Sequence, residues 1–337
     1  MQRRELPEGW DRDIPVFSPD AKGDAGRNVS GKVLNAIAAN VPWLMGGSAD
    51  LAPSTKTLLT FDGAGDFSVD NPGGRNFHFG VREHAMGALI NGMSLCKIRP
   101  YGSGFLIFSD YARPAIRLGA LMEIPVIHIF THDSIGVGED GPTHQPVEHL
   151  VSLRAIPHMI VLRPADANEV AEAWRVIMKL RHQPVALILS RQNLPTLDRN
   201  RFAPAAGVAR GAYVLADTGE GMPEIILMGT GSEVSLCIET YEQLAAEGIR
   251  TRVVSMPSWE LFDQQDRDYR DKVLPPEVTA RISVEQASTL GWAKYVGFQG
   301  ISIGMETFGA SAPLKALQNK FGFTVEHLLQ QARQLIR

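Results

Sequence analysis

The chain has 337 residues, of which 44% are hydrophobic and 21% charged, a composition typical of soluble globular proteins with room for about two domains. Its 33 Lys and Arg residues against 37 Asp and Glu residues give a formal net charge of -4, so no overall positive charge attracts nucleic acid or an anionic membrane. An anionic ligand must therefore be bound by a local group of basic residues.

Cysteine usage and the N-terminus together predict a cytoplasmic location. Cys96 and Cys237 lie in separate predicted helices, so we expect reduced thiols. The charged N-terminus is not followed by an apolar run, and no later stretch reaches the roughly 18 apolar residues of a membrane helix. We therefore expect a cytoplasmic protein that binds neither nucleic acid nor membrane.

From Val29 to Arg191, short apolar runs alternate with segments of helical period, a pattern typical of a doubly wound α/β sheet. The predicted strands are residues 43–48, 77–81, 125–130, 159–166 and 184–191, and the predicted helices are residues 29–40, 83–97, 144–156 and 167–181. Several strands are apolar almost throughout, which indicates a parallel sheet covered on both faces.

A stretch rich in Pro, Gly and Arg at residues 192–211 interrupts this alternation, and a second α/β unit follows it. Its predicted strands are residues 224–229, 251–256, 280–286 and 300–305, and its predicted helices are residues 232–248, 313–322 and 324–336, the last capped by Thr324. We therefore expect two three-layer α/β/α domains with mainly parallel sheets, at residues 1–195 and 211–337, joined by a linker at residues 196–210.

The segment THDSIGVGEDGPTHQP, residues 131–146, is the most unusual loop of the sequence. It holds two histidines, two aspartates, a glutamate and three glycines directly after an apolar strand. Ligands of open α/β sheets bind beyond the carboxyl ends of strands, and glycines let the backbone approach a ligand closely. A ligand-binding loop and a plain surface loop both remain open, whereas the spacing of His132 and His144 does not match a metal site.

Glu83 opens the predicted helix in the segment GVREHAMG. The helix dipole by itself favours a carboxylate in a first turn. A functional role instead requires burial of Glu83 against a ligand nitrogen, which raises the carboxyl pKa toward proton sharing. The buried face of this helix is predicted to carry Met86, Leu89, Ile90 and Met93.

Phe105, Phe108 and Tyr111 are spaced by three residues, so on a helical turn they share one face. Such a face usually packs in a core, but this one follows two glycines at a strand end, where a flat heteroaromatic ring could stack.

Three arginines end strands or flank turns, where a guanidinium can bind a phosphate through forked hydrogen bonds: Arg27, Arg163 and Arg191. The segment GTGSEV lacks the third glycine of a dinucleotide loop, and the sequence has no Walker loop, no GxSxG elbow and no HExxH motif.

Taken together, these segments resemble transketolases, the thiamine diphosphate-dependent enzymes of the pentose phosphate pathway. The resemblance starts near Ile14 and rests on GGSADLAPS, GVREHAMG, YGSGFLIFSDYA, THDSIGVGEDGPTHQP, RPADANEVAEAW, LSRQNLP, RGAYVL, MGTGSEVSL and FGASAPL, in that order. The chain has no Gly-Asp-Gly motif, which a complete transketolase carries in its diphosphate-binding domain. It therefore resembles only the pyrimidine-binding and C-terminal domains, as in the C-terminal subunit of a split transketolase or a fragment of a whole one.

The resemblance implies roles for individual residues. Glu83 matches the glutamate that hydrogen-bonds the aminopyrimidine ring and promotes formation of the cofactor carbanion. Phe105, Phe108 and Tyr111 match the aromatic pocket around that ring, and Asp50 matches a residue near the cofactor.

For the substrate, the resemblance implies that His144, also a catalytic residue, and Asp140 contact hydroxyls of the donor sugar. The residues that match the clamp on the sugar phosphate are Arg27, Ser54, His132 and Arg191.

The implied activity is a transferase reaction that moves a two-carbon ketol unit from a ketose phosphate to an aldose phosphate. The resemblance assigns magnesium or calcium, with the cofactor diphosphate, to a partner N-terminal subunit that carries Gly-Asp-Gly and a downstream Asn. The chain is then inactive alone, binds no metal itself, and self-associates as a homodimer or as a heterotetramer with the partner. The alternatives are a subunit like deoxyxylulose phosphate synthase, one like a 2-oxo acid dehydrogenase β subunit, and a non-catalytic dimerisation module.

Overall fold

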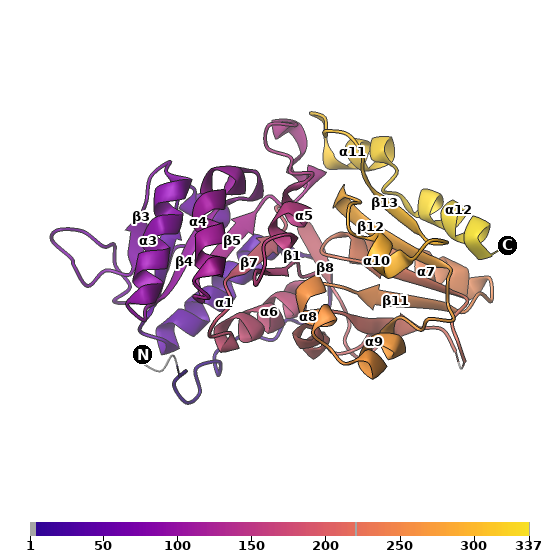
Figure 1. Cartoon of the computed structure of the whole chain (residues 1–337), viewed down its shortest axis with the longest axis horizontal. Coiled ribbons are helices and arrows are strands. Elements are labelled where there is room, and N and C mark those ends of the chain that lie inside the picture. Colours follow the sequence, from indigo (N-terminus) through magenta and orange to yellow (C-terminus); the bar gives the residue numbers. More distant parts are fainter. Residues whose placement is uncertain (1–4, 220, 337) are drawn as a thin grey trace.

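The computed structural model describes residues 5–219 and 221–336, which form two α/β units side by side (Figure 1). The first unit is built on a six-stranded sheet and the second on a five-stranded sheet. The predicted α/β class is therefore confirmed. In the part of the chain that the structure describes, no helix is long and apolar enough to cross a membrane.

All strands of the first sheet are parallel and follow the order β3-β2-β4-β5-β7-β6. The strands are β2 (Leu44–Ser48), β3 (Asn76–His78), β4 (Arg99–Phe105), β5 (Ile127–Thr131), β6 (Ile160–Leu162) and β7 (Val185–Leu189). The helices are α1 (Gly26–Asn40), α2 (Ala52–Thr55), α3 (Glu83–Leu95), α4 (Ser109–Leu121), α5 (His149–Arg154) and α6 (Ala167–Lys179), with 3-10 helices η1 (Leu106–Phe108) and η2 (Ile135–Asp140). Strands β5 and β7 are buried throughout, as their apolar sequences predict.

Three predicted helices of the first unit are shorter in the structure, among them α6, which ends at Lys179 rather than at residue 181. The helix predicted at residues 144–156 begins only at His149. Gln145 precedes Pro146, and the proline ring disfavours the helical conformation of the residue before it. Helix α3 ends at Leu95, so Cys96 lies just beyond it and Lys97 adopts a left-handed φ of 68°.

Helix α3 packs on two sides, which explains an error in its predicted buried face. Met86 and Ile90 are buried, as expected, whereas Leu89 is 55% exposed. Gly87 faces α4 so closely that an added Cβ atom would lie 2.7 Å from the Cβ of Ala115. The sheet and α4 together cover only part of the helix, and Leu89 points outward.

A two-stranded antiparallel sheet that the sequence pattern does not reveal joins β1 (Asp20–Ala25) to β8 (Asn193–Thr196). Strand β1 has the polar sequence DAKGDA and is largely exposed, so it lacks the apolar alternation of a predictable strand. At its end, the Ser190 hydroxyl accepts a hydrogen bond from the backbone N–H of Gly26 (2.9 Å). This pairing brings the segment before Arg27 beside the segment after Arg191.

The second sheet has the order β13-β12-β10-β11-β9, and only β9 is antiparallel to its neighbour. Its strands are β9 (Tyr213–Asp217), β10 (Ile225–Gly229), β11 (Thr251–Ser255), β12 (Arg281–Ser288) and β13 (Ile301–Met305). The helices are α7 (Glu233–Ala246), α8 (Trp259–Asp263), α9 (Arg267–Val273), α10 (Ala293–Val296), α11 (Leu314–Phe321) and α12 (Val325–Ile336). Thr324 caps α12 as predicted, because its hydroxyl accepts a hydrogen bond from the N–H of His327 (3.2 Å).

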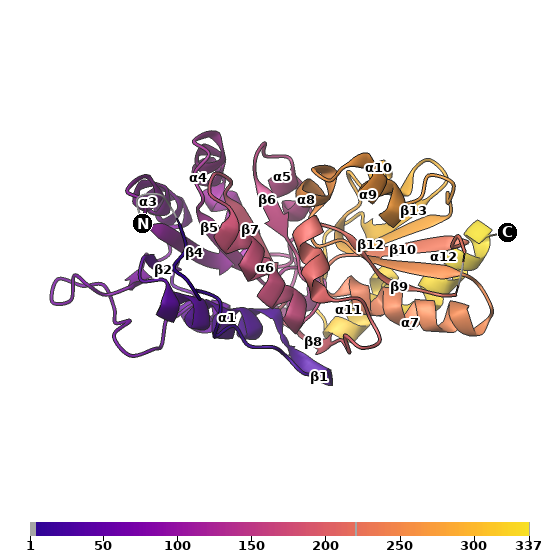
Figure 2. The ribbon, with the colours of Figure 1, turned by 90° about the horizontal axis from the view of Figure 1, so that it is seen from below.

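The two units lie side by side (Figure 2), and buried ion pairs join them. Arg163, which follows β6, is 1% exposed and donates hydrogen bonds to the Asp133 carboxylate (3.0 Å) and the Thr230 carbonyl (2.9 Å), and it also pairs with Glu233. The expectation that Arg163 could bind a phosphate is wrong, because its guanidinium is already neutralised by these carboxylates. The GTGSEV segment, which supplies Thr230 and Glu233, forms part of this contact between the units.

His128 in β5 makes protein stability depend on pH. Its side chain is buried, its ring stacks on that of Phe130, and its Nε2 atom has no hydrogen-bond partner among the residues that the structure describes. Burial lowers the pKa of His128 to about 4. Because the unfolded chain has a histidine pKa near 6.5, it binds more protons than the folded chain between pH 4 and 6.5, and stability falls as pH falls through that window.

We predict that His128 alone lowers the free energy of unfolding by about 2 kcal/mol between pH 7 and pH 5, at about 1.4 kcal/mol per pH unit below 6.5. Urea denaturation of the wild type and of His128→Phe at both pH values measures this difference. The variant should lose that part of the pH dependence. An identical pH dependence in both proteins would contradict the assignment.

Candidate active site

The predicted site residues gather at one edge of the first sheet, because its parallel strands all end there. Phe105 is the last residue of β4, and His132 directly follows β5. Asp50, Glu83 and Arg191 come shortly after β2, β3 and β7. The structure thus brings residues from separated segments to the carboxyl edge, where open α/β sheets bind ligands.

Three aromatic side chains form a row that runs outward from this edge, which we call the aromatic row: Phe105, Phe108 and Tyr111. The ring centroids of Phe105 and Phe108 are 5.9 Å apart, and those of Phe108 and Tyr111 are 6.2 Å apart, both in stacked geometry. The residues come from the end of β4, from η1 and from α4, so they do not share one helical face. Phe105 is 9% exposed and Tyr111 is 65% exposed, so the row ends at the surface.

Two histidines of the loop at residues 131–146 lie against the aromatic row. The His132 ring stacks on Phe105 with a centroid distance of 3.6 Å. The His144 ring stands edge-on to Phe108 at 5.6 Å and to Phe105 at 6.5 Å. His132 has a φ of 60°, a left-handed backbone that side chains other than glycine adopt only when their surroundings impose it.

Two arginines give this edge a positive charge. Burial, together with the charges of Arg27, Arg191 and His144, lowers the pKa of His132 to about 3, so the His132 imidazole is neutral near pH 7. Burial and the charge of Arg191 also lower the pKa of the Arg27 guanidinium.

Neither Arg27 nor Arg191 forms an ion pair with a carboxylate within residues 5–219 and 221–336. Arg27 instead donates a hydrogen bond to the backbone carbonyl of Ser54 (2.9 Å). Two neighbouring cations without a carboxylate between them repel each other, and a bound anion removes that repulsion.

The acidic site residues remain available to a ligand. Glu83 is the first residue of α3 and is half-buried, and its carboxylate has no hydrogen bond or ion pair with any residue that the structure describes. The predicted burial against a ligand nitrogen is thus not provided by this chain alone. Asp50, with a φ of 62°, and Asp140, at the end of η2, are both exposed.

The residues present fit one end of thiamine diphosphate. The aromatic row offers flat faces to a heteroaromatic ring. The Glu83 carboxylate, without a partner among the described residues, lies at the start of α3, and this helix packs against α4, which carries Tyr111. A possible group of metal ligands among the described residues is Asp110, Glu148 and His149, between α4 and α5. There Asp110 Oδ2 lies 3.1 Å from His149 Nε2.

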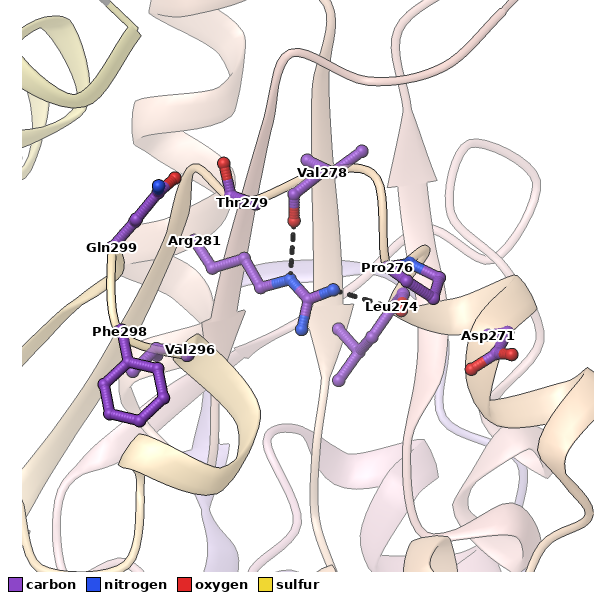
Figure 3. A pocket seen from close by; sticks show the side chains of 10 residues that line it. Asp271, Leu274, Pro276, Val278, Thr279, Arg281, Val296, Phe298 and Gln299 are labelled. Carbon is purple, nitrogen blue, oxygen red and sulfur yellow. Dashed lines mark hydrogen bonds between the residues drawn. The ribbon is translucent and has the colours of Figure 1, made fainter.

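A separate hollow in the second unit does not belong to this site (Figure 3). It lies at the start of β12, the amino end of that strand, away from the edge where ligands of parallel sheets bind. The Arg281 guanidinium lines it and donates hydrogen bonds to the backbone carbonyls of Val278, Tyr295 and Pro275. We regard this arginine as structural because main-chain oxygens already hold it.

Two family models match the chain. Residues 24–196 match the model described as "Transketolase, pyrimidine binding domain", and residues 211–324 match the "Transketolase-like TK C-terminal domain". The two units are therefore those of an enzyme family whose members use thiamine diphosphate with a divalent metal. The chain belongs to the transketolase family and carries its pyrimidine-binding and C-terminal domains.

Known relatives show how much of a transketolase the chain spans. It is 51% identical over 333 residues to the transketolase of Geobacillus stearothermophilus, covering 98% of this chain and 49% of that relative. A transketolase complex with sedoheptulose-7-phosphate from Pichia stipitis is 41% identical with a TM-score of 0.91, over 99% of this chain and 49% of the other. A structure described as "Split gene transketolase, inactive beta4 tetramer" is 25% identical with a TM-score of 0.74, over 93% of this chain and 99% of that one. The chain thus spans about half the length of the curated relatives it matches.

Proposed function

We propose that the chain is the C-terminal subunit of a split transketolase, which moves a two-carbon ketol unit between sugar phosphates only together with an N-terminal partner chain. The observation that carries the substrate class is a pair of arginines, Arg27 and Arg191, that lie beside the neutral His132 and have no carboxylate partner among the described residues. A dianionic phosphate neutralises both guanidiniums, and His132 can donate it a hydrogen bond. The Pichia stipitis relative, which forms a complex with a sugar phosphate, supports this choice.

Thiamine diphosphate, when bound, supplies the carbon nucleophile and the electron sink for ketol transfer. In our proposal the aromatic row binds its aminopyrimidine ring, Glu83 holds and shares a proton at a ring nitrogen, and Asp50 lies nearby. His144, edge-on to Phe105 and Phe108, hydrogen-bonds a hydroxyl of the donor sugar and moves a proton there, and Asp140 contacts a sugar hydroxyl as well.

The diphosphate and its metal, magnesium or calcium, belong in this proposal to the partner chain, because no Gly-Asp-Gly motif occurs in this sequence. Two observations support assembly with further chains. The split-gene relative is an inactive tetramer of one chain type, and its chain has nearly the extent of this one. Helices α3 and α4 also expose Leu89, Leu95, Leu118 and Leu121, an apolar face that association would bury.

We predict that the chain alone, supplied with thiamine diphosphate and magnesium, shows no ketol transfer from a ketose phosphate to an aldose phosphate. Adding an N-terminal chain with the Gly-Asp-Gly motif from the same organism should restore turnover, measured as formation of the product sugar phosphates. Robust turnover by the chain alone would exclude the split-subunit proposal. Failure of the assembled pair to turn over would favour the non-catalytic dimerisation module.

In the assembled enzyme, we expect Glu83→Gln to remove most of the turnover at saturating cofactor and to leave the donor KM nearly unchanged, since an amide cannot share a proton as a carboxyl group does. Glu326→Gln is a matched control, because Glu326 also lies in the first turn of a helix, α12, in the second unit. Near-normal turnover of the Glu83 variant would show that this carboxylate serves only the helix dipole.

For the phosphate clamp, we expect Arg191→Ala to raise the KM of a phosphorylated donor by roughly 10- to 150-fold. This range follows from about 1.5–3 kcal/mol for hydrogen bonds to a charged group, at about 1.4 kcal/mol per decade. The loss should appear mainly in KM, because the phosphate is remote from the bond that breaks and is bound similarly in the ground state and in the transition state. A small unphosphorylated hydroxy-keto acid is the control donor, and an equal loss toward both donors would make Arg191 structural.

A further inference from the structure

A segment of the second unit, residues 308–312, packs against the loop that carries Asp140 and His144. This segment follows β13 and leads into α11, which lies beside η2 of that loop (Figure 1). The two segments are about 165 residues apart in the chain, so only the docking of the second unit on the first brings them together.

Gln145 is the centre of this contact. Its side-chain amide nitrogen donates to the backbone carbonyl of Gly138 (2.8 Å) and to that of Ala310 (2.9 Å). The Gln145 side chain is 1% exposed, so both bonds are shielded from water. One amide group therefore joins the two ends of the turn at residues 138–145 and ties both to the second unit. Residue patterns in the sequence do not single out Gln145, because each of its partners is a backbone atom.

Ser311 and Gly309 complete the contact. The Ser311 hydroxyl donates a hydrogen bond to the backbone carbonyl of Glu139. A Cβ atom added at Gly309 would lie 1.8 Å from the Gln145 Oε1 atom, so only glycine allows this approach. The 308–312 segment is therefore closely packed against the loop.

Backbone hydrogen bonds continue from this contact to His144. The N–H of Gly141 donates to the carbonyl of Gly138 (3.1 Å), which is also bound by Gln145, and the N–H of His144 donates to the carbonyl of Gly141 (3.0 Å). Gly141 has a φ of 77°, a turn conformation suited to glycine. The backbone position of His144 therefore depends on the carbonyls that Gln145 and Ser311 hold.

We propose that Gln145 and Ser311 are positioning residues and that the 308–312 segment gives the C-terminal domain a role in catalysis, which is to hold the His144 imidazole in place over the aromatic row. Only the expected effect of these residues on ketol transfer rests on the proposed function. The positioning itself is a property of this chain and can be measured without a partner or a cofactor.

Hydrogen–deuterium exchange of the full chain tests the positioning directly. Loss of one neutral hydrogen bond in Ser311→Ala should speed exchange of the Gly141 and His144 amides by about 3- to 10-fold, and Gln145→Met, which removes two bonds, should speed it more. Ser302→Ala is the matched control, because Ser302 in β13 accepts a hydrogen bond from Ser283 (2.9 Å) in the same sheet and does not contact the loop. The control and the conservative variant Ser311→Thr should leave the loop amides at wild-type rates.

The kinetic test uses the assembled enzyme. Ser311→Ala and Gln145→Met should lower kcat by several-fold to tenfold while the KM for the phosphorylated donor and the affinity for thiamine diphosphate stay within about twofold, because His144 acts near the bond that breaks and the clamp is untouched. Ser311→Thr should restore kcat. A variant that merely destabilised the chain would instead change cofactor affinity and KM together.

The outcomes separate this inference from the proposed function. Unchanged exchange of the loop amides in both variants overturns the positioning, whatever the enzyme does. Faster exchange with an unchanged kcat overturns the catalytic role of the 308–312 segment. Faster exchange in a chain whose wild-type assembly shows no ketol transfer supports the positioning and overturns the proposed function instead.

Discussion

The buried guanidinium of Arg163 is the interaction on which the arrangement of the two units depends. It pairs with Asp133 of the first unit and Glu233 of the second, and although burial lowers its pKa, these two carboxylates outweigh that effect and raise it. Removing one member of such a buried set leaves an uncompensated charge, which costs about 3–5 kcal/mol. A second buried pair, Arg154 with Glu285, joins the units beside it; burial raises the pKa of Glu285, but Arg154 outweighs this and lowers it to about 2.

The same contacts that join the units also shape the candidate site. Asp133 directly follows His132, so the loop at residues 131–146 is anchored at its start by Arg163 and near its end by Gln145 and the second unit. Between these two anchors the loop presents His132 and His144 to the aromatic row. The left-handed backbone conformation of His132 persists because the anchored loop and the strand before it hold this residue in place.

Part of the candidate site is exposed at the surface of this chain. The Glu83 carboxylate has no partner among residues 5–219 and 221–336, and Tyr111 is largely exposed. The helices that carry them, α3 and α4, also expose Leu89, Leu95, Leu118 and Leu121. Association with another chain would bury these leucines, which agrees with the proposal that a partner completes the site.

The sequence by itself determined the α/β class, most strands of both sheets, the Thr324 cap and the chemistry available at strand ends, because apolar periodicity and capping are local properties. It also determined which residue types stand after each strand, and parallel topology then places them at one edge. Tertiary structure alone decided which arginines pair with a carboxylate. Arg163 pairs with Glu233, 70 residues away, whereas Arg27 and Arg191 have no carboxylate partner in the described part of the chain. It likewise decided the polar pairing of β1 with β8, the exposure of Leu89 and the contact of Gln145 with Ala310. Each of these depends on a partner far along the chain, and such a partner leaves no mark on the local pattern of residues.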